Sequence, residues 1–330
     1  RVSREVIGSR FLFTGLRLWV TIALMVFPAG AVAGDDWLLR PGAFPAKITS
    51  DGRDVTLENG LIRRVIRITP GVATIAFDQL TTGTSILRAV KPEARVTIDG
   101  ESFSIGGLSG QPDHGYLTPK WLALLEADGV AFRYLSHTIS DIVAPFPWKR
   151  VRHAEDRPWP PPGRALAIRT VPEPGTLPGV VVTLHYEIYD GLPLLAKWLT
   201  IENGGPASIK IDHFTSEILA VVEHASTVEP SKSRSPESIH VESDYCFGGM
   251  DRDSSDVTTH WLPDPDYRTQ VNYARQTLCL LESKPPIGPG VTLAPGKTFT
   301  SFRTFELAND SSERERRGLA VRRMYRTIAP

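Results

Sequence analysis

Cysteine is scarce in this chain, and the usual metal and phosphate motifs are missing. Only two of its 330 residues are cysteines, Cys246 and Cys279, and neither belongs to a CxxC pair. The eight histidines are scattered, without an HExxH motif or a pair spaced by four, so the sequence predicts no zinc site. Gly248-Gly249 is not followed by Lys-Ser or Lys-Thr, which excludes a phosphate loop there. We expect no cofactor.

The chain also lacks an excess of charge of either sign. It holds 37 basic and 37 acidic residues. Residues 1–33 contain four arginines and one glutamate, which leaves 33 basic and 36 acidic residues, a net charge of −3, for the rest. A slightly acidic body without a basic stripe argues against nucleic acid as a partner. No pattern in the sequence predicts the oligomeric state.

Long apolar runs are absent as well. The run Leu18–Phe27 (LWVTIALMVF) follows Arg17, and Ala31-Val32-Ala33 offers a small-residue cleavage site. The run has about the length of a signal-peptide core and is short of the ~18 residues that cross a bilayer comfortably. We therefore expect residues 1–33 to be a signal peptide of an exported protein, either periplasmic or secreted; an uncleaved membrane anchor is the alternative. In an exported protein the two cysteines could form a disulfide or remain buried thiols.

What the sequence does contain is a series of short strand-like runs over residues 34–310. Glu58-Asn59-Gly60 and Asp99-Gly100 are typical of tight hairpins. Runs that recur at roughly 8–12 residues without intervening helices favour a sandwich or barrel. We predict an all-β fold, a large antiparallel β-supersandwich. Its expected strands are 54–57, 61–68, 73–79, 94–98, 101–105, 122–128, 131–137, 165–170, 180–189, 194–202, 209–219, 239–243, 277–281, 291–293 and 299–307.

The clearest strand signal lies in Gly179–Phe214. Val182, Leu184, Tyr186 and Ile188 alternate with more polar residues, which is the period of a half-buried strand. Asp190-Gly191 provides a turn, and a second strand carrying Trp198 follows. Asn203-Gly204-Gly205-Pro206 then ends that strand, because glycine and proline interrupt a ladder.

The last segment of the chain changes to a helical pattern. Ser311 or Ser312 is a suitable N-cap for a helix with Glu313 and Glu315 in its first turn. We expect residues 311–330 to be a helical linker toward a catalytic domain that lies beyond Pro330. A terminal helix docked on a sheet edge is the alternative.

Two long loops carry the candidate sugar-binding residues. One is the proline-rich segment 145–162 with Trp148 and Trp159, and the other holds Asp244, Tyr245 and Asp251. Aromatic rings can stack on the C–H faces of pyranoses while carboxylates bind hydroxyl groups, and such loops on a rigid β scaffold are common binding sites. Packing against the sandwich is the alternative role for either loop.

No acidic pair is marked as catalytic by its context. A glycosidase needs two carboxylates about 5–5.5 Å or about 6.5–9.5 Å apart. Glu217 and Glu223 are candidates, but carboxylates at the end of an apolar strand are more often solvated or hydrogen-bonded structural residues. Asp212-His213 could act as the acid–base pair of an aldose epimerase, although a histidine in an alternating strand is more often a packed residue. Gly107-Leu108-Ser109-Gly110 lacks the spacing of a nucleophile elbow.

Three motifs resemble the N-terminal domain of melibiase-type α-galactosidases. They are YEIYDGLPLL with the following Lys197-Trp198-Leu199 and Ile201-Glu202-Asn203, the stretch LAPGKTF at 293–299, and LENGLI at 57–62. The resemblance covers roughly residues 50–310. It implies a galactose-mutarotase-like β-supersandwich that precedes a (β/α)₈ barrel, and it places both catalytic aspartates in that barrel, beyond Pro330.

The resemblance leads to one main expectation and two alternatives. We expect the non-catalytic N-terminal domain of an exported glycoside hydrolase, which supports a downstream barrel and edges its sugar pocket. A stand-alone carbohydrate-binding or scaffold module is the first alternative, and an aldose epimerase is the second. On the main reading the isolated chain has no catalytic residue and no glycosidase activity, and its partners are a carbohydrate and the barrel.

Overall fold

The computed structural model describes residues 36–151, 153, 157–223, 236–245, 257–269 and 272–329. The expected signal segment 1–33 lies outside them, as do Cys246 and Asp251. Within the described ranges, no helix has the length and hydrophobicity needed to cross a membrane.

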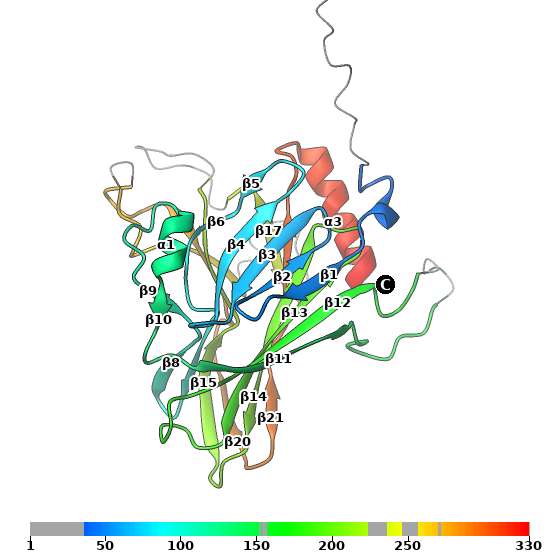
Figure 1. The fold of residues 1–330 in the computed structure, drawn as a ribbon. Coiled ribbons are helices and arrows are strands. Elements are labelled where there is room, and N and C mark those ends of the chain that lie inside the picture. The colour runs from blue at the N-terminus through cyan, green and yellow to red at the C-terminus, as the bar shows by residue number, and fades with distance from the viewer. Residues whose placement is uncertain are drawn as a thin grey trace, which may run out of the picture. The chain divides into compact units, whose positions relative to one another are not determined.

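The largest sheet has seven antiparallel strands, in the order β11-β12-β13-β14-β22-β17, with β21 also paired to β14 (Figure 1). The predicted strands of Gly179–Phe214 lie at its centre. His185 faces Trp198 and Tyr186 faces Lys197 across the β13–β14 pair. The strands are β11 (Arg133–Asp141), β12 (Gly163–Val171), β13 (Val180–Tyr189), β14 (Leu194–Asn203), β17 (Ile239–Ser243), β21 (Thr298–Thr300) and β22 (Thr304–Ala308).

Four smaller antiparallel sheets complete the strand content of the described residues. The five-stranded sheet contains β1 (Lys47–Ser50), β2 (Asp54–Glu58), β3 (Ile62–Arg67), β4 (Ala73–Gln79) and β5 (Thr84–Ser85). One four-stranded sheet contains β20 (Pro289–Leu293), β15 (Ile209–Thr215), β7 (Ala94–Ile98) and β8 (Glu101–Ile105). The other contains β18 (Thr259–Pro263), β19 (Leu278–Ser283), β16 (Glu217–Val221) and β6 (Leu87–Ala89). The last pairs β9 (Leu108–Ser109) with β10 (Glu126–Ala127).

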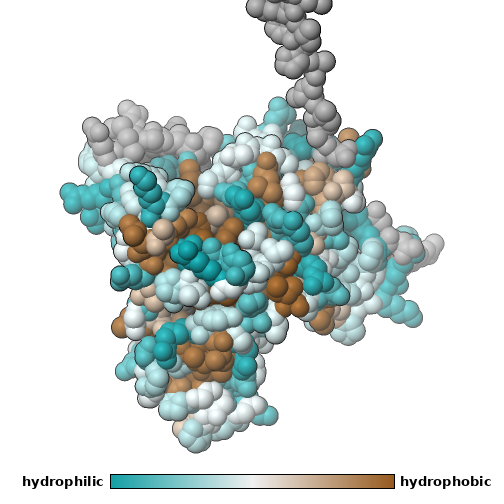
Figure 2. All heavy atoms as spheres, viewed as in Figure 1, coloured by the Kyte–Doolittle hydropathy of each residue, from teal (hydrophilic) through white to brown (hydrophobic). Residues whose placement is uncertain are grey.

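One apolar core joins the seven-stranded sheet to the three sheets of four or five strands. Alternate residues of β13, such as Val182, Leu184 and Ile188, are fully buried and pack with Leu57 of β2 and Val96 of β7. On the face shown in Figure 2, apolar residues form separate patches among hydrophilic ones. The predicted all-β antiparallel sandwich is confirmed.

A second apolar cluster covers the other face of the seven-stranded sheet. Helix α3 (Arg314–Ile328) contributes Ala320, Val321, Met324 and Ile328, which pack with strand residues that include Leu307. Figure 1 shows α3, in red, beside these strands. The helix is therefore part of the folded sandwich. Whether it also leads to a further domain stays a prediction.

The N-cap prediction for this helix was wrong. The cap residue is Glu313, and no side chain bonds the first turn. Ser311 Oγ instead accepts a hydrogen bond from the backbone N–H of Glu313, at 3.0 Å. This serine therefore stabilises the turn that precedes the helix and does not cap the helix.

Several strand predictions were also wrong. Residues 122–128 form the end of helix α1 (Pro119–Leu124) followed by the two-residue β10, because Thr118 Oγ1 caps Trp121 N–H at 3.3 Å and Pro119 suits a first helical turn. The expected strand 209–219 is divided at Ser216 between two sheets. Strand β18 was not among the expected strands. The 3₁₀ helix η1 (Pro41–Ala43) was not predicted.

A cluster of ionisable side chains lies buried in the main core. Arg64 Nη1 is 2.9 Å from both Glu217 and Glu306, and Lys197 Nζ is 2.9 Å from both Glu93 and Glu217. At most 2% of any of these side chains is exposed. Glu217, which the sequence had offered as a functional carboxylate, is therefore out of reach of a sugar in this structure.

Candidate functional site

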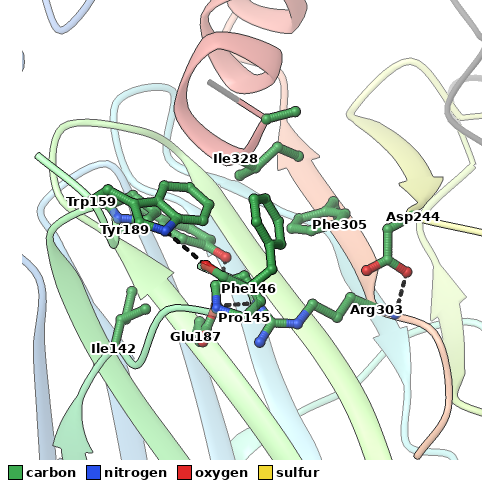
Figure 3. Close-up of a pocket in the computed structure, with 12 residues that line it drawn as sticks. Ile142, Pro145, Phe146, Trp159, Glu187, Tyr189, Asp244, Arg303, Phe305 and Ile328 are labelled. Carbon is green, nitrogen blue, oxygen red and sulfur yellow. Dashed lines mark hydrogen bonds and ion pairs between the residues drawn. The ribbon is translucent and has the colours of Figure 1, made fainter. Parts of the chain in front are cut away.

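A cavity of about 350 Å³ lies between the end of α3 and the α3-facing side of the seven-stranded sheet (Figure 3). Strand β13 supplies its floor, the segment after β11 supplies an aromatic wall, and the residues flanking β17 and β22 close the remaining side. The lining residues are Ile142, Pro145, Phe146, Trp159, Pro161, Glu187, Tyr189, Asp244, Arg303, Phe305, Ile328 and Ala329. A mainly apolar hollow with a few convergent polar groups is the usual form of a small-molecule site.

The aromatic wall consists of Phe146 and Trp159. Their ring centroids are 4.8 Å apart, with an angle of 41° between the ring planes. The indole N–H of Trp159 donates to the backbone carbonyl of Phe146 at 3.1 Å, which ties the two arms of the long loop together. Trp148 lies behind, with its ring centroid 6.0 Å from that of Trp159.

The polar floor centres on Glu187. Its side-chain Oε2 accepts a hydrogen bond from the Tyr189 hydroxyl at 2.7 Å and contacts Arg303 Nη1 at 3.2 Å. The residue is only 2% exposed. Burial raises the pKa of Glu187, and it outweighs the opposing effects of Arg303 and Tyr189.

Arg303 connects the two sides of the cavity. Its backbone N–H donates to Asp244 Oδ1 at 2.7 Å, and its carbonyl accepts from Asp244 N–H at 3.1 Å. Figure 3 shows its side chain extending from this contact toward Glu187. Asp244 keeps solvent-exposed surface, yet crowding of its carboxyl group by the surrounding protein raises its pKa despite the bonds to Arg303.

A stacked pair extends from this floor along the same face of the sheet. The Arg303 guanidinium lies 4.1 Å from the ring centroid of Trp198, and the His185 ring stacks on Trp198 at 4.9 Å and 6°. His185 Nε2 is 3.0 Å from Thr200 Oγ1. Burial, helped by the charge of Arg303, lowers the pKa of His185 to about 4. This histidine is therefore neutral at physiological pH.

The structure brings two of the five predicted sugar-binding residues to this cavity. Trp159 and Asp244, which come from different loops, both line it. Trp148 contacts Trp159 without lining the cavity. Tyr245 is 58% exposed, and its ring packs 5.9 Å from that of Phe302. Asp251 lies outside the described residues.

Glu187 and Arg303 were missed by the sequence reasoning. Glu187 occupies an ordinary outward position of a strand, and Arg303 immediately precedes another strand 116 residues later. One signal was available, because His185 and Glu187 lie on the same face of a strand that is otherwise strongly apolar.

The remaining acid–base candidates lie elsewhere. Asp212 accepts from the backbone N–H of Gly100 at 2.9 Å and pairs with Lys210 at 2.6 Å, contacts that lower its pKa, with the Lys210 bond contributing most. His213 borders a separate cavity of about 320 Å³. Glu223 accepts a hydrogen bond from the hydroxyl of Tyr267. In the part of the chain that the structure describes, no group of three His, Cys, Asp or Glu side chains is arranged to hold a metal ion.

The comparisons with known proteins concern structure alone. No protein-family model and no curated protein sequence matches this chain. Solved structures that are similar include a GH36 α-galactosidase from Geobacillus stearothermophilus, at 12% identity and a TM-score of 0.42 over 80% of this chain and 41% of that one. An α-galactosidase from Lactobacillus brevis matches at 8% identity and a TM-score of 0.44, over 82% and 41% of the two chains.

A smaller protein is also similar. A putative aldose 1-epimerase from Escherichia coli K12 matches at 11% identity and a TM-score of 0.33, over 80% of this chain and 98% of its own. These identities and TM-scores establish no shared activity. The chain spans about two fifths of the length of the α-galactosidases. The structural neighbours thus include the enzymes that the sequence motifs resemble, and the observed β-sandwich agrees with that resemblance.

Proposed function

We propose that residues 34–310 with helix α3 are a non-catalytic, carbohydrate-binding domain of an exported glycoside hydrolase. On this proposal the domain binds sugar in the cavity between α3 and β13 and supports a catalytic barrel that follows in the chain. Residues 1–33 direct export, with an uncleaved membrane anchor as the alternative form of the same segment.

One observation carries the proposal of sugar binding. Two loops selected from the sequence for sugar-binding chemistry meet in one cavity, where Trp159 and Phe146 form an aromatic wall and Asp244, Glu187 and Arg303 provide polar groups. Pyranoses present an apolar C–H face and a polar rim of hydroxyl groups. A wall of rings beside convergent polar groups suits such a ligand.

Calorimetric titration of the full chain tests the proposal. The probes are the methyl α-glycosides of galactose, glucose and mannose, and oligosaccharides that contain galactose. We expect saturable binding of at least one probe, and at least about fivefold weaker binding by Trp159→Ala, since an aromatic contact contributes ~1 kcal/mol.

Trp121→Ala is the matched control, because Trp121 is also partly exposed and pairs with an aromatic ring, that of Tyr116, but does not line the cavity. Absence of saturable binding by the wild-type chain would overturn the proposal. Mutarotation and glycoside hydrolysis are assayed on the same protein. The expected result is no acceleration over buffer, and acceleration of mutarotation would favour the epimerase alternative instead.

A further inference from the structure

We infer that Glu187 and Arg303 form the recognition pair of this cavity and select neutral pyranoses that present two adjacent hydroxyl groups. The inference rests on the proposed sugar-binding function and adds to it the residues that set specificity and the class of sugar they accept.

Glu187 has a carboxylate oxygen to offer a ligand. A carboxylate can accept hydrogen bonds at both oxygens. Among the described residues, the Tyr189 hydroxyl and the Arg303 guanidinium both contact Oε2. Oε1 is left to accept a hydroxyl hydrogen inside the cavity that Glu187 lines. The two contacts to Oε2 hold the carboxylate group at the floor of the cavity before a sugar arrives.

Arg303 supplies the complementary donor. A guanidinium carries five N–H donors in a rigid plane, and within the described ranges Nη1 is its nitrogen in contact with Glu187. The backbone bonds to Asp244 hold one end of this residue, and the ring of Trp198 supports the guanidinium at 4.1 Å. The remaining N–H groups can therefore donate from a fixed position.

The pair places an acceptor and a donor next to each other. Glu187 Oε2 and Arg303 Nη1 are 3.2 Å apart, which brings Oε1 and the remaining guanidinium N–H groups close to one another. A ligand that spans the pair must therefore offer a donor and an acceptor on neighbouring atoms. Two hydroxyl groups on adjacent ring carbons do this, one donating to the carboxylate and one accepting from the guanidinium. A lone hydroxyl, or two hydroxyls on distant carbons, would satisfy only one partner.

The charges of the cavity select against acidic sugars. Its lining contains two carboxyl groups, Glu187 and Asp244, and one guanidinium, Arg303. A uronate would bring a further carboxylate to a site where the single cation is already engaged by Glu187. Like charges in a partly buried site repel strongly, so a neutral pyranose is the favoured ligand.

The experiment measures the binding of several sugar analogues to the wild type and to variants of the pair, as in a double-mutant cycle. The methyl glycoside that binds best is compared with its 2-, 3- and 4-deoxy analogues and with the corresponding uronate. Glu187→Gln and Arg303→Gln each remove a charge while retaining a polar amide. We expect each variant to bind about tenfold or more weakly, as for the loss of a charged hydrogen bond, and the uronate to show no saturable binding.

The deoxy analogues make the test specific. A deoxy analogue that lacks one hydroxyl of the adjacent pair should bind the wild type more weakly than the parent sugar does. In the variant that lacks the side chain contacting that hydroxyl, the same analogue and the parent sugar should bind with nearly equal affinity. The matched controls are Glu282→Gln and Arg95→Gln, an ion pair at 3.6 Å that does not line this cavity, and these should bind as the wild type does. Unchanged near-ultraviolet circular dichroism shows that a variant is folded.

The possible outcomes separate the two proposals. If Trp159→Ala weakens binding while Glu187→Gln and Arg303→Gln do not, the cavity binds sugar and the recognition pair is wrong. Equal binding of the uronate and the neutral sugar contradicts the charge selection. If the wild type binds no probe, the proposed function fails and the recognition pair fails with it.

Discussion

Glu217 and Glu306 contact the same atom, Arg64 Nη1, each at a distance of 2.9 Å. Their pKa values nevertheless shift in opposite directions. Although burial opposes it, the charges of Arg64 and Lys197 hold the pKa of Glu217 well below its ordinary value. Burial and the neighbouring charge of Glu217 raise the pKa of Glu306 well above its ordinary value. We therefore expect Glu306 to be the protonated member of the pair, with Glu93 and Glu217 balancing the two cations.

Glutamine substitutions should separate these two carboxyl groups. With Glu306 protonated, Glu306→Gln exchanges a neutral acid for a neutral amide of similar size, so we expect the free energy of unfolding in urea at pH 7 to change by less than about 1 kcal/mol. Glu217→Gln leaves buried cations without their partner and should cost about 3–5 kcal/mol. Equal losses in the two variants would show that Glu306 is charged.

His185 should make stability depend on pH. Because its folded pKa is lowered from 6.5 to about 4, the unfolded chain binds more protons between these values. The contribution of His185 is therefore complete above about pH 6.5 and is lost as pH falls toward 4, by at most about 1.4 kcal/mol per pH unit. Urea unfolding at several pH values should show a smaller loss for His185→Gln than for the wild type. Parallel losses would contradict the assigned pKa.

Helix α3 should contribute to the stability of the sandwich. Met324 is fully buried against the seven-stranded sheet, whereas Leu319 on the same helix is 48% exposed. We expect Met324→Ala to lower the free energy of unfolding by about 2–5 kcal/mol and Leu319→Ala to change it by less than about 0.5 kcal/mol. Urea titration of both variants measures this, and similar small effects would mean that α3 is not docked.

Cys279 should be unreactive in the folded protein. It is a fully buried free thiol, and burial raises its pKa to about 11. Since the thiolate is the reactive form, we expect no alkylation of Cys279 by iodoacetamide at pH 8 until urea unfolds the chain, and complete alkylation afterwards without a reductant. Peptide mass spectrometry follows this cysteine separately from Cys246. Rapid labelling under native conditions would contradict the prediction.

The strands that sequence predicted best are those whose side chains alternate most regularly. The predicted bounds of β13 and β17 agree with the structure. Each strand places alternate apolar side chains in the main core, and that burial is what the alternation in the sequence predicts. Strand β18, with the sequence THWLP, has no such alternation. It exists because β19 offers it a hydrogen-bonding edge, which is a tertiary effect.

In the candidate site, too, features that depend on local sequence could be predicted and features that depend on tertiary contacts could not. The sequence indicated the loops of Trp159 and Asp244, because aromatic rings and carboxylates on long loops suit a sugar, and the structure places both residues in one cavity; their binding role stays a prediction. The partnership of Glu187 with Arg303 could not be predicted, since it joins residues 116 positions apart through the pairing of β14 with β22. The buried partners of Arg64 were equally hidden, because single charged residues in strands read as solvent-exposed positions.

The packing of α3 has a practical consequence for dissecting this protein. Asp36 and Asp310 both pair with Arg316, and the Trp37 indole donates to Asp310 at 2.8 Å. Residues that precede the first strand are therefore bonded to α3 and to Asp310, which precedes it. A recombinant piece that stopped at residue 310 would uncover the apolar strip formed by Leu194, Ala196, Phe305 and Leu307 and would tend to aggregate. A piece intended for purification should therefore include Asp36 and Trp37 as well as the whole of α3.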